Sequence, residues 1–280
     1  MTRGAPIVVL LCAALSVSGA SRPAPADAFP QRWERAAPGL DRLTLDISGG
    51  GEGWNTRIVA LRLDPRAFRF SLRAAMRDGL PAWTVDAAPA GAAVALNAGQ
   101  FTRVAPWGWV VTGGRELQPP GHGPLAGALS WDAAGRIRWL EPDEIEPARE
   151  RGDVAEAFQS YPVLLDRNGE VPLALSDGRL GVDVNHRDGR LAIGTLPDGR
   201  LIIALTRFNG LGPLSPPVPL GLTLAEMAAV MRGLGCQRAV ALDGGVSAQL
   251  MTREDGRRRI WHGWRSVPLG LVAEPLPRAE

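Results

Sequence analysis

The sequence of 280 residues contains no lysine, so every cationic side chain other than histidine is an arginine. This absence excludes Schiff-base chemistry and a P-loop, because both depend on a lysine ammonium group. An anion bound by a side chain would therefore be held by arginine, whose planar fork grips phosphate or carboxylate in a bidentate manner. The formal net charge is only +2, and no basic stripe with interleaved aromatics is present, so nucleic acid is not an expected partner.

Cysteine is also scarce, because the chain has only Cys12 and Cys236. Cys12 lies in the apolar run 7–17, which is too short to span a bilayer and is followed by the small residues Ser18-Gly19-Ala20. This pattern predicts a signal peptide over residues 1–20, with an uncleaved membrane anchor as the alternative. Export to the periplasm or the medium would leave one thiol, no internal disulfide and no transmembrane span, so stability must come from the core.

Glycine and proline are abundant instead, with 34 and 24 residues, which favours turns and short strands over long helices. The stretch 21–40 is rich in proline and alanine, lacks periodicity and is predicted to be a tether. Residues 41–275 are expected to form one domain. The expected fold class is α+β, a single β-rich mixed domain with a central sheet and a few helices.

Short apolar or alternating segments bounded by turn residues predict a series of strands. The clearest hairpin joins 190–196 to 201–205 through Pro197-Asp198-Gly199. Because its second arm is apolar on both faces, we expect that arm to lie inside a sheet. The other strands are expected at residues 57–63, 68–73, 92–96, 109–112, 126–131, 136–140, 162–165, 238–242, 247–251 and 267–272.

Two segments have the character of helices. The stronger candidate runs from Leu224 to Leu234, where apolar residues repeat at the spacing of one buried face. Thr223 and Glu226 supply a capping box at its start, which fixes the expected N-terminus. The charged segment 141–157 is expected to form a second, solvated helix.

A conspicuous carboxylate, Asp243, follows an apolar strand and precedes Gly244 and Gly245. A strand end is a rigid mount for a carboxylate, and glycines let a ligand approach the backbone amides. Asp-Gly is also common in plain turns, so this feature alone leaves a turn and a site open. Ser247 does not fit a hydrolase nucleophile elbow, because the position two residues later holds Gln249 instead of glycine.

The histidines and tryptophans give weaker signals. His122, His186 and His262 lack the spacing of metal ligands, so no metal site is predicted and no cofactor is specified. His122 lies between two glycines and is the most site-like of the three. Trp107-Gly108-Trp109 and the segment 261–264 place tryptophans beside glycine, where they either stack on sugar rings or belong to the core.

Several motifs, taken in chain order, resemble those of the phosphodiester glycosidase family over roughly residues 90–272. They are Asn97-Ala98-Gly99-Gln100-Phe101, Ser160-Tyr161-Pro162-Val163-Leu164, Arg190-Leu191-Ala192-Ile193-Gly194, the helix and strand at 222–242, Asp243-Gly244-Gly245-Val246-Ser247, and Arg265 before Val267-Pro268. The family pattern differs at Ala98, Gln100, Tyr161, Leu191, Val246 and Ala248. The resemblance therefore points to a divergent bacterial branch.

The resemblance implies an exported glycosidase that cleaves the bond between a sugar C1 and a phosphodiester oxygen. The departing phosphate monoester has a second pKa of roughly 6 and leaves with little help from an acid. An ordinary glycoside usually needs a second carboxylic acid for this purpose. A single well-placed carboxylate with cationic donors is thus sufficient for the implied reaction, and the expected partner is a carbohydrate or sugar phosphate.

The resemblance also implies roles for individual residues. Asp243 would be the nucleophile or the base for water, Arg190 and Arg265 would hold the phosphate, and Asn97 would bond a sugar hydroxyl or orient water. The remaining residues expected to bind substrate are Gly244 and Gly245 through their amides, Ser247, His122 and Trp107. The alternatives are a non-catalytic glycan-binding protein of the envelope or exopolysaccharide system, and an envelope scaffold protein.

Overall fold

A computed structural model describes residues 32–47, 55–102, 105–175, 183–208 and 220–277. The signal peptide predicted at 1–20 and the first part of the predicted tether lie outside these residues. None of the helices in the described part of the chain combines the length and the apolar character that crossing a bilayer requires.

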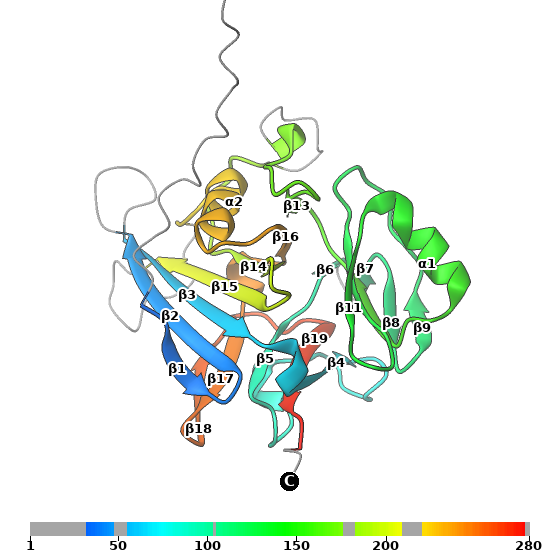
Figure 1. The fold of residues 1–280 in the computed structure, drawn as a ribbon, viewed down its shortest axis with the longest axis horizontal. Helices are drawn as coiled ribbons and strands as arrows, with labels where there is room; N and C mark the ends of the chain where they lie inside the picture. The colour runs from blue at the N-terminus through cyan, green and yellow to red at the C-terminus, as the bar shows by residue number, and fades with distance from the viewer. Residues whose placement is uncertain (1–31, 48–54, 103–104, 176–182, 209–219, 278–280) are drawn as a thin grey trace, which may run out of the picture.

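Three antiparallel sheets make up most of the fold, and the largest has seven strands (Figure 1). Its order is β1 (Glu34–Ala37), β2 (Leu40–Ile47), β3 (Thr56–Leu63), β15 (Leu201–Phe208), β14 (Leu191–Thr195), β16 (Arg238–Leu242) and β13 (Val163–Leu165). The hairpin predicted from 190–205 is confirmed as β14 and β15, with Leu191 opposite Leu205.

Two five-stranded sheets and a short ribbon complete the strands. One sheet has the order β11 (Ile137–Leu140), β10 (Ala128–Trp131), β12 (Glu156–Gln159), β8 (Val110–Thr112) and β9 (Arg115–Gln118). The other has the order β18 (Arg257–Trp261), β17 (Leu250–Glu254), β5 (Val94–Asn97), β19 (Leu269–Pro275) and β4 (Phe68–Ala74). The ribbon pairs β6 (Gln100–Phe101) with β7 (Pro106–Trp107).

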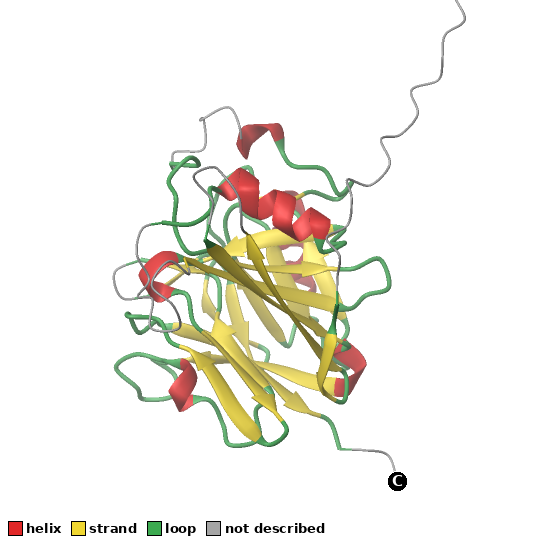
Figure 2. Ribbon diagram, turned by 90° about the vertical axis from the view of Figure 1, so that its left-hand side faces the viewer, coloured by secondary structure: helices red, strands yellow, loops and turns green. Residues whose placement is uncertain are grey.

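The central strands of the seven-stranded sheet are buried on both faces, which explains their apolar sequences. In β15, Leu201, Ile203 and Leu205 join a core shared with the other two sheets. Ile202 and Ala204 point the other way, into a second core beneath the helix α2. Figure 2 shows this layering, with the helix outside the strands. The strand predicted to lie inside a sheet therefore does so, between β3 and β14.

Helix α2 (Leu224–Gly233) matches the predicted segment, including its cap. The Thr223 hydroxyl accepts a hydrogen bond from Glu226 N at 3.2 Å, and a Glu226 carboxylate oxygen accepts one from Thr223 N at 2.9 Å. The buried face carries Leu224, Met227 and Met231 against the sheet. Burial of a side chain of this size contributes about 1.5–3 kcal/mol relative to exposure, so packing and the cap both favour the helix.

The expected α+β class with a β-rich domain and few helices is consistent with this architecture, in which the strands form several sheets. Three expectations about the fold are corrected. Strand β1 lies within the predicted tether, because its residues pair with β2, so the domain begins before Asp41. The predicted helix at 141–157 shortens to α1 (Ile145–Arg151), because residues 156–159 pair with β10. The predicted strand at 247–251 starts at Leu250, because Gly245–Ser247 forms a 3-10 turn.

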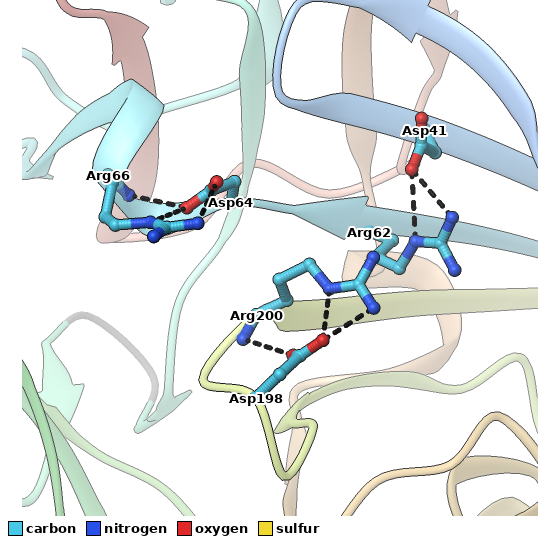
Figure 3. Close-up of polar contacts among 6 residues, drawn as sticks. All are labelled: Asp41, Arg62, Asp64, Arg66, Asp198 and Arg200. Carbon is cyan, nitrogen blue, oxygen red and sulfur yellow. Dashed lines mark hydrogen bonds and ion pairs between the residues drawn. The ribbon is translucent and has the colours of Figure 1, made fainter.

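Paired charges mark one surface of the seven-stranded sheet (Figure 3). The carboxylates of this surface ion cluster each contact an arginine, in the pairs Asp41–Arg62 at 2.8 Å, Asp64–Arg66 at 2.9 Å and Asp198–Arg200 at 2.6 Å. The hydrogen bonds from Arg66 and Arg200 hold the pKa values of Asp64 and Asp198 below the usual value. Exposed pairs of this kind contribute about 0–1 kcal/mol each.

Candidate active site

The loop that precedes β14 lies against the loop that follows β16. The strands pair antiparallel with Leu191 opposite Leu242, so the residues before β14 face those after β16. Gly245 N donates a hydrogen bond to Gly189 O at 2.7 Å. A Cβ added at Gly244 would lie 2.5 Å from the same oxygen. The glycines of the Asp243 loop are therefore required by the close approach of the facing backbone.

These loops open into a pocket of about 530 Å³. It brings together the carboxylates of three aspartates, one arginine and a set of aromatic and polar side chains from distant parts of the chain. The residues of interest that line it are Asp183, Asp188, Asp243, Arg190, Gly244, His122, Trp107, Tyr161 and Gln100. Among the residues that the structure describes, no three His, Cys, Asp or Glu side chains converge in a way that could hold a metal ion.

Asp243 directly follows β16, and its partly buried side chain lines the pocket. Burial raises the pKa of its carboxyl, and the negative charge of Asp188 raises it further. A hydrogen bond with the Ser247 side chain and the positive charge of Arg265 act in the opposite direction. Burial dominates, so this carboxyl is a stronger base than an exposed aspartate and holds a proton to higher pH.

Asn97 has a different place from the one expected. Its side chain is 1% exposed and does not line the pocket. Asn97 Nδ2 donates to Asp243 O at 2.8 Å, and its Oδ1 accepts from Gln249 N at 3.0 Å. The amide is thus committed to the backbone on either side of the Asp243 loop. The role expected for Asn97, contact with a sugar hydroxyl or a water, stays a prediction, and these backbone contacts indicate that the residue positions the Asp243 loop.

Arg190 lies in the pocket wall, as predicted, and is fixed there by backbone oxygens. Its Nε donates to Leu222 O at 2.7 Å, and its Nη2 donates to His186 O. Burial lowers the pKa of this guanidinium, while the charges of Asp188 and other carboxylates raise it. The result is a cation held in one orientation beside the pocket carboxylates.

Arg265 and Gly245 also differ from the simplest expectation. Arg265 is exposed and lies outside the lining of the pocket, with its guanidinium 5.2 Å from the centre of the Phe101 ring. Its charge still lowers the pKa of Asp243. The Gly245 amide is occupied by Gly189 O, so it is not directed at a ligand. Ser247 is buried and acts on Asp243 through its side chain.

Trp107 and His122, both predicted to bind substrate, line the aromatic side of the pocket. The Trp107 and Tyr161 rings meet edge to face with their centres 6.2 Å apart. Gln100 Nε2 donates to Tyr161 O at 2.9 Å, so two positions that depart from the family pattern contact each other at the pocket. Trp109, by contrast, is 1% exposed and belongs to the core.

A buried amide that the sequence did not reveal holds this side together. Gln159 Oε1 accepts from Trp109 N at 2.9 Å and from Gly121 N at 2.7 Å. Its Nε2 donates to Gly121 O at 3.0 Å and to Ala126 O at 2.9 Å. The loops that carry Trp107 and His122 are therefore tied to each other through one side chain.

Asp188 is a second carboxylate of the pocket, and the sequence analysis did not predict it. Its Oδ1 accepts from Gly189 N at 2.8 Å, and its side chain is 26% exposed. The available signal was the repeated Asp-Gly pair, since Asp188-Gly189 comes just before β14 as Asp243-Gly244 comes just after β16. Only the antiparallel pairing of these two strands shows that the pairs face each other.

Comparison with known protein families identifies the family to which this chain belongs. A family model described as phosphodiester glycosidase matches residues 90–274, which is more than half of the chain. The chain belongs to the phosphodiester glycosidase family. The matched span contains both Asp-Gly pairs and all the pocket residues named above. Comparison with curated proteins gave no match.

Solved structures share the fold of this family member at low identity. The catalytic domain of zebrafish N-acetylglucosamine-1-phosphodiester alpha-N-acetylglucosaminidase, auto-inhibited by its pro-peptide, has a TM-score of 0.66 and 17% identity over 87% of this chain and 86% of that one. A Synechocystis protein has a TM-score of 0.65 and 16% identity over 89% of this chain, which spans 64% of the Synechocystis chain. A Burkholderia pseudomallei protein has a TM-score of 0.55 and 17% identity, with 79% and 74% covered.

Proposed function

We propose that this phosphodiester glycosidase is an exported hydrolase that cleaves the C1–O bond of a sugar-1-phosphodiester in envelope or extracellular glycans. The observation that carries the proposal is Asp243, a buried carboxyl with a raised pKa in a pocket that also contains a fixed arginine. Family membership supplies the reaction class.

In this proposal Asp243 is the base that removes a proton from the attacking water. Raising the pKa of a carboxyl toward the operating pH makes its ionised form a better base. Burial supplies the rise, and Ser247 with Arg265 limits it. Asn97 and Gly99 O hold the Asp243 backbone from both sides, at 2.8 and 3.0 Å, so the carboxyl is aimed without substrate.

The phosphate side of the substrate is assigned to the arginines. Arg190 is pinned by two carbonyls and meets the growing charge of the departing phosphate without reorganising. Arg265, at the pocket margin, adds a second positive charge. Because the leaving phosphate monoester has a second pKa of roughly 6, it departs without a general acid.

Two further observations bear on substrate and location. The zebrafish enzyme with the same fold carries N-acetylglucosamine-1-phosphodiester in its name, which supports a sugar-1-phosphodiester as the substrate class. Gln100 and Tyr161 depart from the family pattern inside the pocket, so we assign them to sugar selection. Export rests on the apolar run 7–17 and the small residues after it.

The test is turnover by the purified mature domain on a panel of sugar-1-phosphodiesters that differ in the sugar. Released sugar and phosphate monoester in equal amounts are the expected products. N-terminal sequencing of the protein from the periplasm or medium tests export, and a mature chain that begins near residue 21 is expected. A chain that keeps its first 20 residues in the membrane would contradict export alone.

Glycan binding without catalysis is the second candidate, and one observation favours it. The Trp107–Tyr161 pair presents aromatic edges and faces in the pocket, as carbohydrate-binding proteins do. Micromolar binding of glycans together with no turnover of any phosphodiester in the panel would select this function. Turnover of any phosphodiester in the panel would rule out glycan binding as the sole activity.

A further inference from the structure

The position of the Asp188 carboxylate depends on the absence of a side chain at Gly245, which lies on the facing loop. Gly245 has φ +57°, and a Cβ added there would lie 2.3 Å from Asp188 Oδ2. Any other residue at position 245 would displace this carboxylate. The third residue of the Asp243-Gly244-Gly245 turn thus creates the space in which the Asp188 carboxylate rests.

A backbone donor, a histidine and an arginine lie around the Asp188 carboxylate. Gly189 N donates to its Oδ1 at 2.8 Å, and His186 Nε2 lies 3.9 Å from its Oδ2. Arg190 is the neighbouring cation, with a favourable charge interaction between the two residues. Asp243 lies on the facing loop, and burial disfavours the charged form of its carboxyl.

We infer that Asp188 is the nucleophile of this pocket and that the reaction passes through a covalent glycosyl ester with retention of configuration at C1. The inference rests on the proposed function, because it takes Asp243 as the base for water. Asp188 and Asp243 lie on facing loops of one pocket, so one carboxylate is placed to attack C1 beside Arg190 and the other to activate the water of a second step.

The two steps balance without any further reactant. First, an Asp188 oxygen forms a bond to C1 while the C1–O bond to phosphate breaks, and the electron pair leaves with the phosphate monoester beside Arg190. Next, a water oxygen attacks C1 and Asp243 takes the proton of that water. The ester bond from C1 to Asp188 breaks, its electron pair returns to the carboxylate, and Asp243 then releases its proton to solvent.

The first experiment uses Asp243→Asn on a phosphodiester that the wild-type protein hydrolyses. Removal of the base slows the second step, so we expect a burst of phosphate monoester equal to the enzyme concentration. Intact-protein mass spectrometry should show one added glycosyl unit, and peptide mapping should place it on Asp188. The double variant Asp188→Asn/Asp243→Asn should show neither burst nor adduct.

Asp183→Asn in the Asp243→Asn background is the matched control. Asp183 lines the same pocket, but its Oδ1 accepts hydrogen bonds from Asn185 N and His186 N in its own loop, each at 3.0 Å. This variant removes one negative charge from the pocket and should keep the adduct on Asp188. Asp188→Asn alone retains an acceptor for Gly189 N, so it should unfold like the wild type and lose at least about a thousandfold in turnover.

The stereochemistry of the wild-type product gives an independent outcome. Proton NMR at early times should show the same anomeric configuration in product and substrate. An inverted product, or an adduct on another residue, would overturn Asp188 as nucleophile while the proposed hydrolysis stands. A wild-type protein that turns over no sugar-1-phosphodiester would overturn the proposed function and this inference with it.

Discussion

Carboxylates in two regions of this protein sit in opposite environments. In the surface ion cluster of Figure 3, Asp64 and Asp198 each face an arginine, and those hydrogen bonds lower the pKa values of both. In the pocket, burial raises the pKa of Asp243, and the nearest acidic neighbour raises it further. The same side-chain type therefore has a lowered pKa in the surface ion cluster and a raised pKa in the pocket.

This difference separates stability from chemistry. Exposed surface pairs each contribute about 0–1 kcal/mol to stability. The pocket brings Asp243 and Asp188 onto facing loops and fixes Arg190 with backbone oxygens in place of a carboxylate partner. Natural proteins break such local rules at functional sites and compensate elsewhere, which agrees with a catalytic pocket on a well-packed β-rich fold.

The largest expected effect is on turnover. Asp243→Asn should reduce the steady-state turnover of a sugar-1-phosphodiester by about a thousandfold, because the base for water is lost. The control Asp198→Asn removes a carboxylate of the surface ion cluster. Its turnover should stay within about twofold of the wild type. Equal rates for Asp243→Asn and wild type would end the assignment of Asp243.

The next effect concerns the space under Asp188. Gly245→Ala should reduce turnover by about a hundredfold, because the new Cβ displaces the Asp188 carboxylate. Gly199→Ala is the matched control, since Gly199 also has a positive φ, +84°, but a Cβ there meets nothing within 4 Å. Both variants should lose about 1–2 kcal/mol of unfolding free energy from the left-handed backbone, as measured by urea denaturation. Equal turnover in the two would refute the contact.

The pH dependence of turnover tests the electrostatics of Asp243. The base must be ionised, so the turnover number should fall as pH falls through a pKa above 3.8, the ordinary value. Ser247→Ala removes a group that lowers this pKa, so the acidic limb should move to higher pH. The direction of the shift follows from the lost hydrogen bond to the Asp243 carboxylate, and a pH–rate profile of the two proteins measures it.

Arg265→Gln should move the acidic limb in the same direction, because the positive charge of Arg265 also lowers the pKa of Asp243. Arg66→Gln is the comparison, since it removes a charge of the same sign from the surface ion cluster. A limb that stays in place in both Ser247→Ala and Arg265→Gln would show that another group controls the pH profile.

The smallest effect is on stability, and the two regions should differ in sign. The folded-state pKa of Asp243 is raised, so its contribution to stability falls as pH rises from the unfolded pKa through the folded one. At pH 7, Asp243→Asn should therefore gain about 1 kcal/mol of unfolding free energy. The pKa of Asp198 is lowered, so its contribution is present above the unfolded pKa and is lost on acidification. Asp198→Asn should lose up to about 0.5 kcal/mol.

The sequence predicted the parts of the fold that local rules control. The capping box of Thr223 and Glu226 and the repeat of apolar residues gave α2, and the Pro197-Asp198-Gly199 turn gave the hairpin of β14 and β15. Local rules failed where pairing with a distant strand decides. Strand β1 lies in a Pro- and Ala-rich stretch, and residues 156–159 leave a helical pattern to pair with β10.

The site was predictable as a set of segments, and its internal roles were not. Asp243, Arg190 and Trp107 reach one pocket as expected. The Asn97 side-chain amide is hydrogen-bonded to two backbone groups, Asp243 O and Gln249 N, and only the structure shows these contacts. Asp188 escaped notice because its importance comes from a strand register and from a glycine 57 positions later, neither of which a local motif encodes.

The most direct test of the central claim is to run the wild-type reaction in water enriched in oxygen-18 and locate the label. Cleavage of the C1–O bond at the Asp243 pocket places oxygen-18 on the sugar hydroxyl and leaves the phosphate monoester unlabelled. This is the predicted result, and it should hold for every sugar-1-phosphodiester that the protein hydrolyses. Label in the phosphate monoester would show cleavage of the P–O bond and would contradict the account.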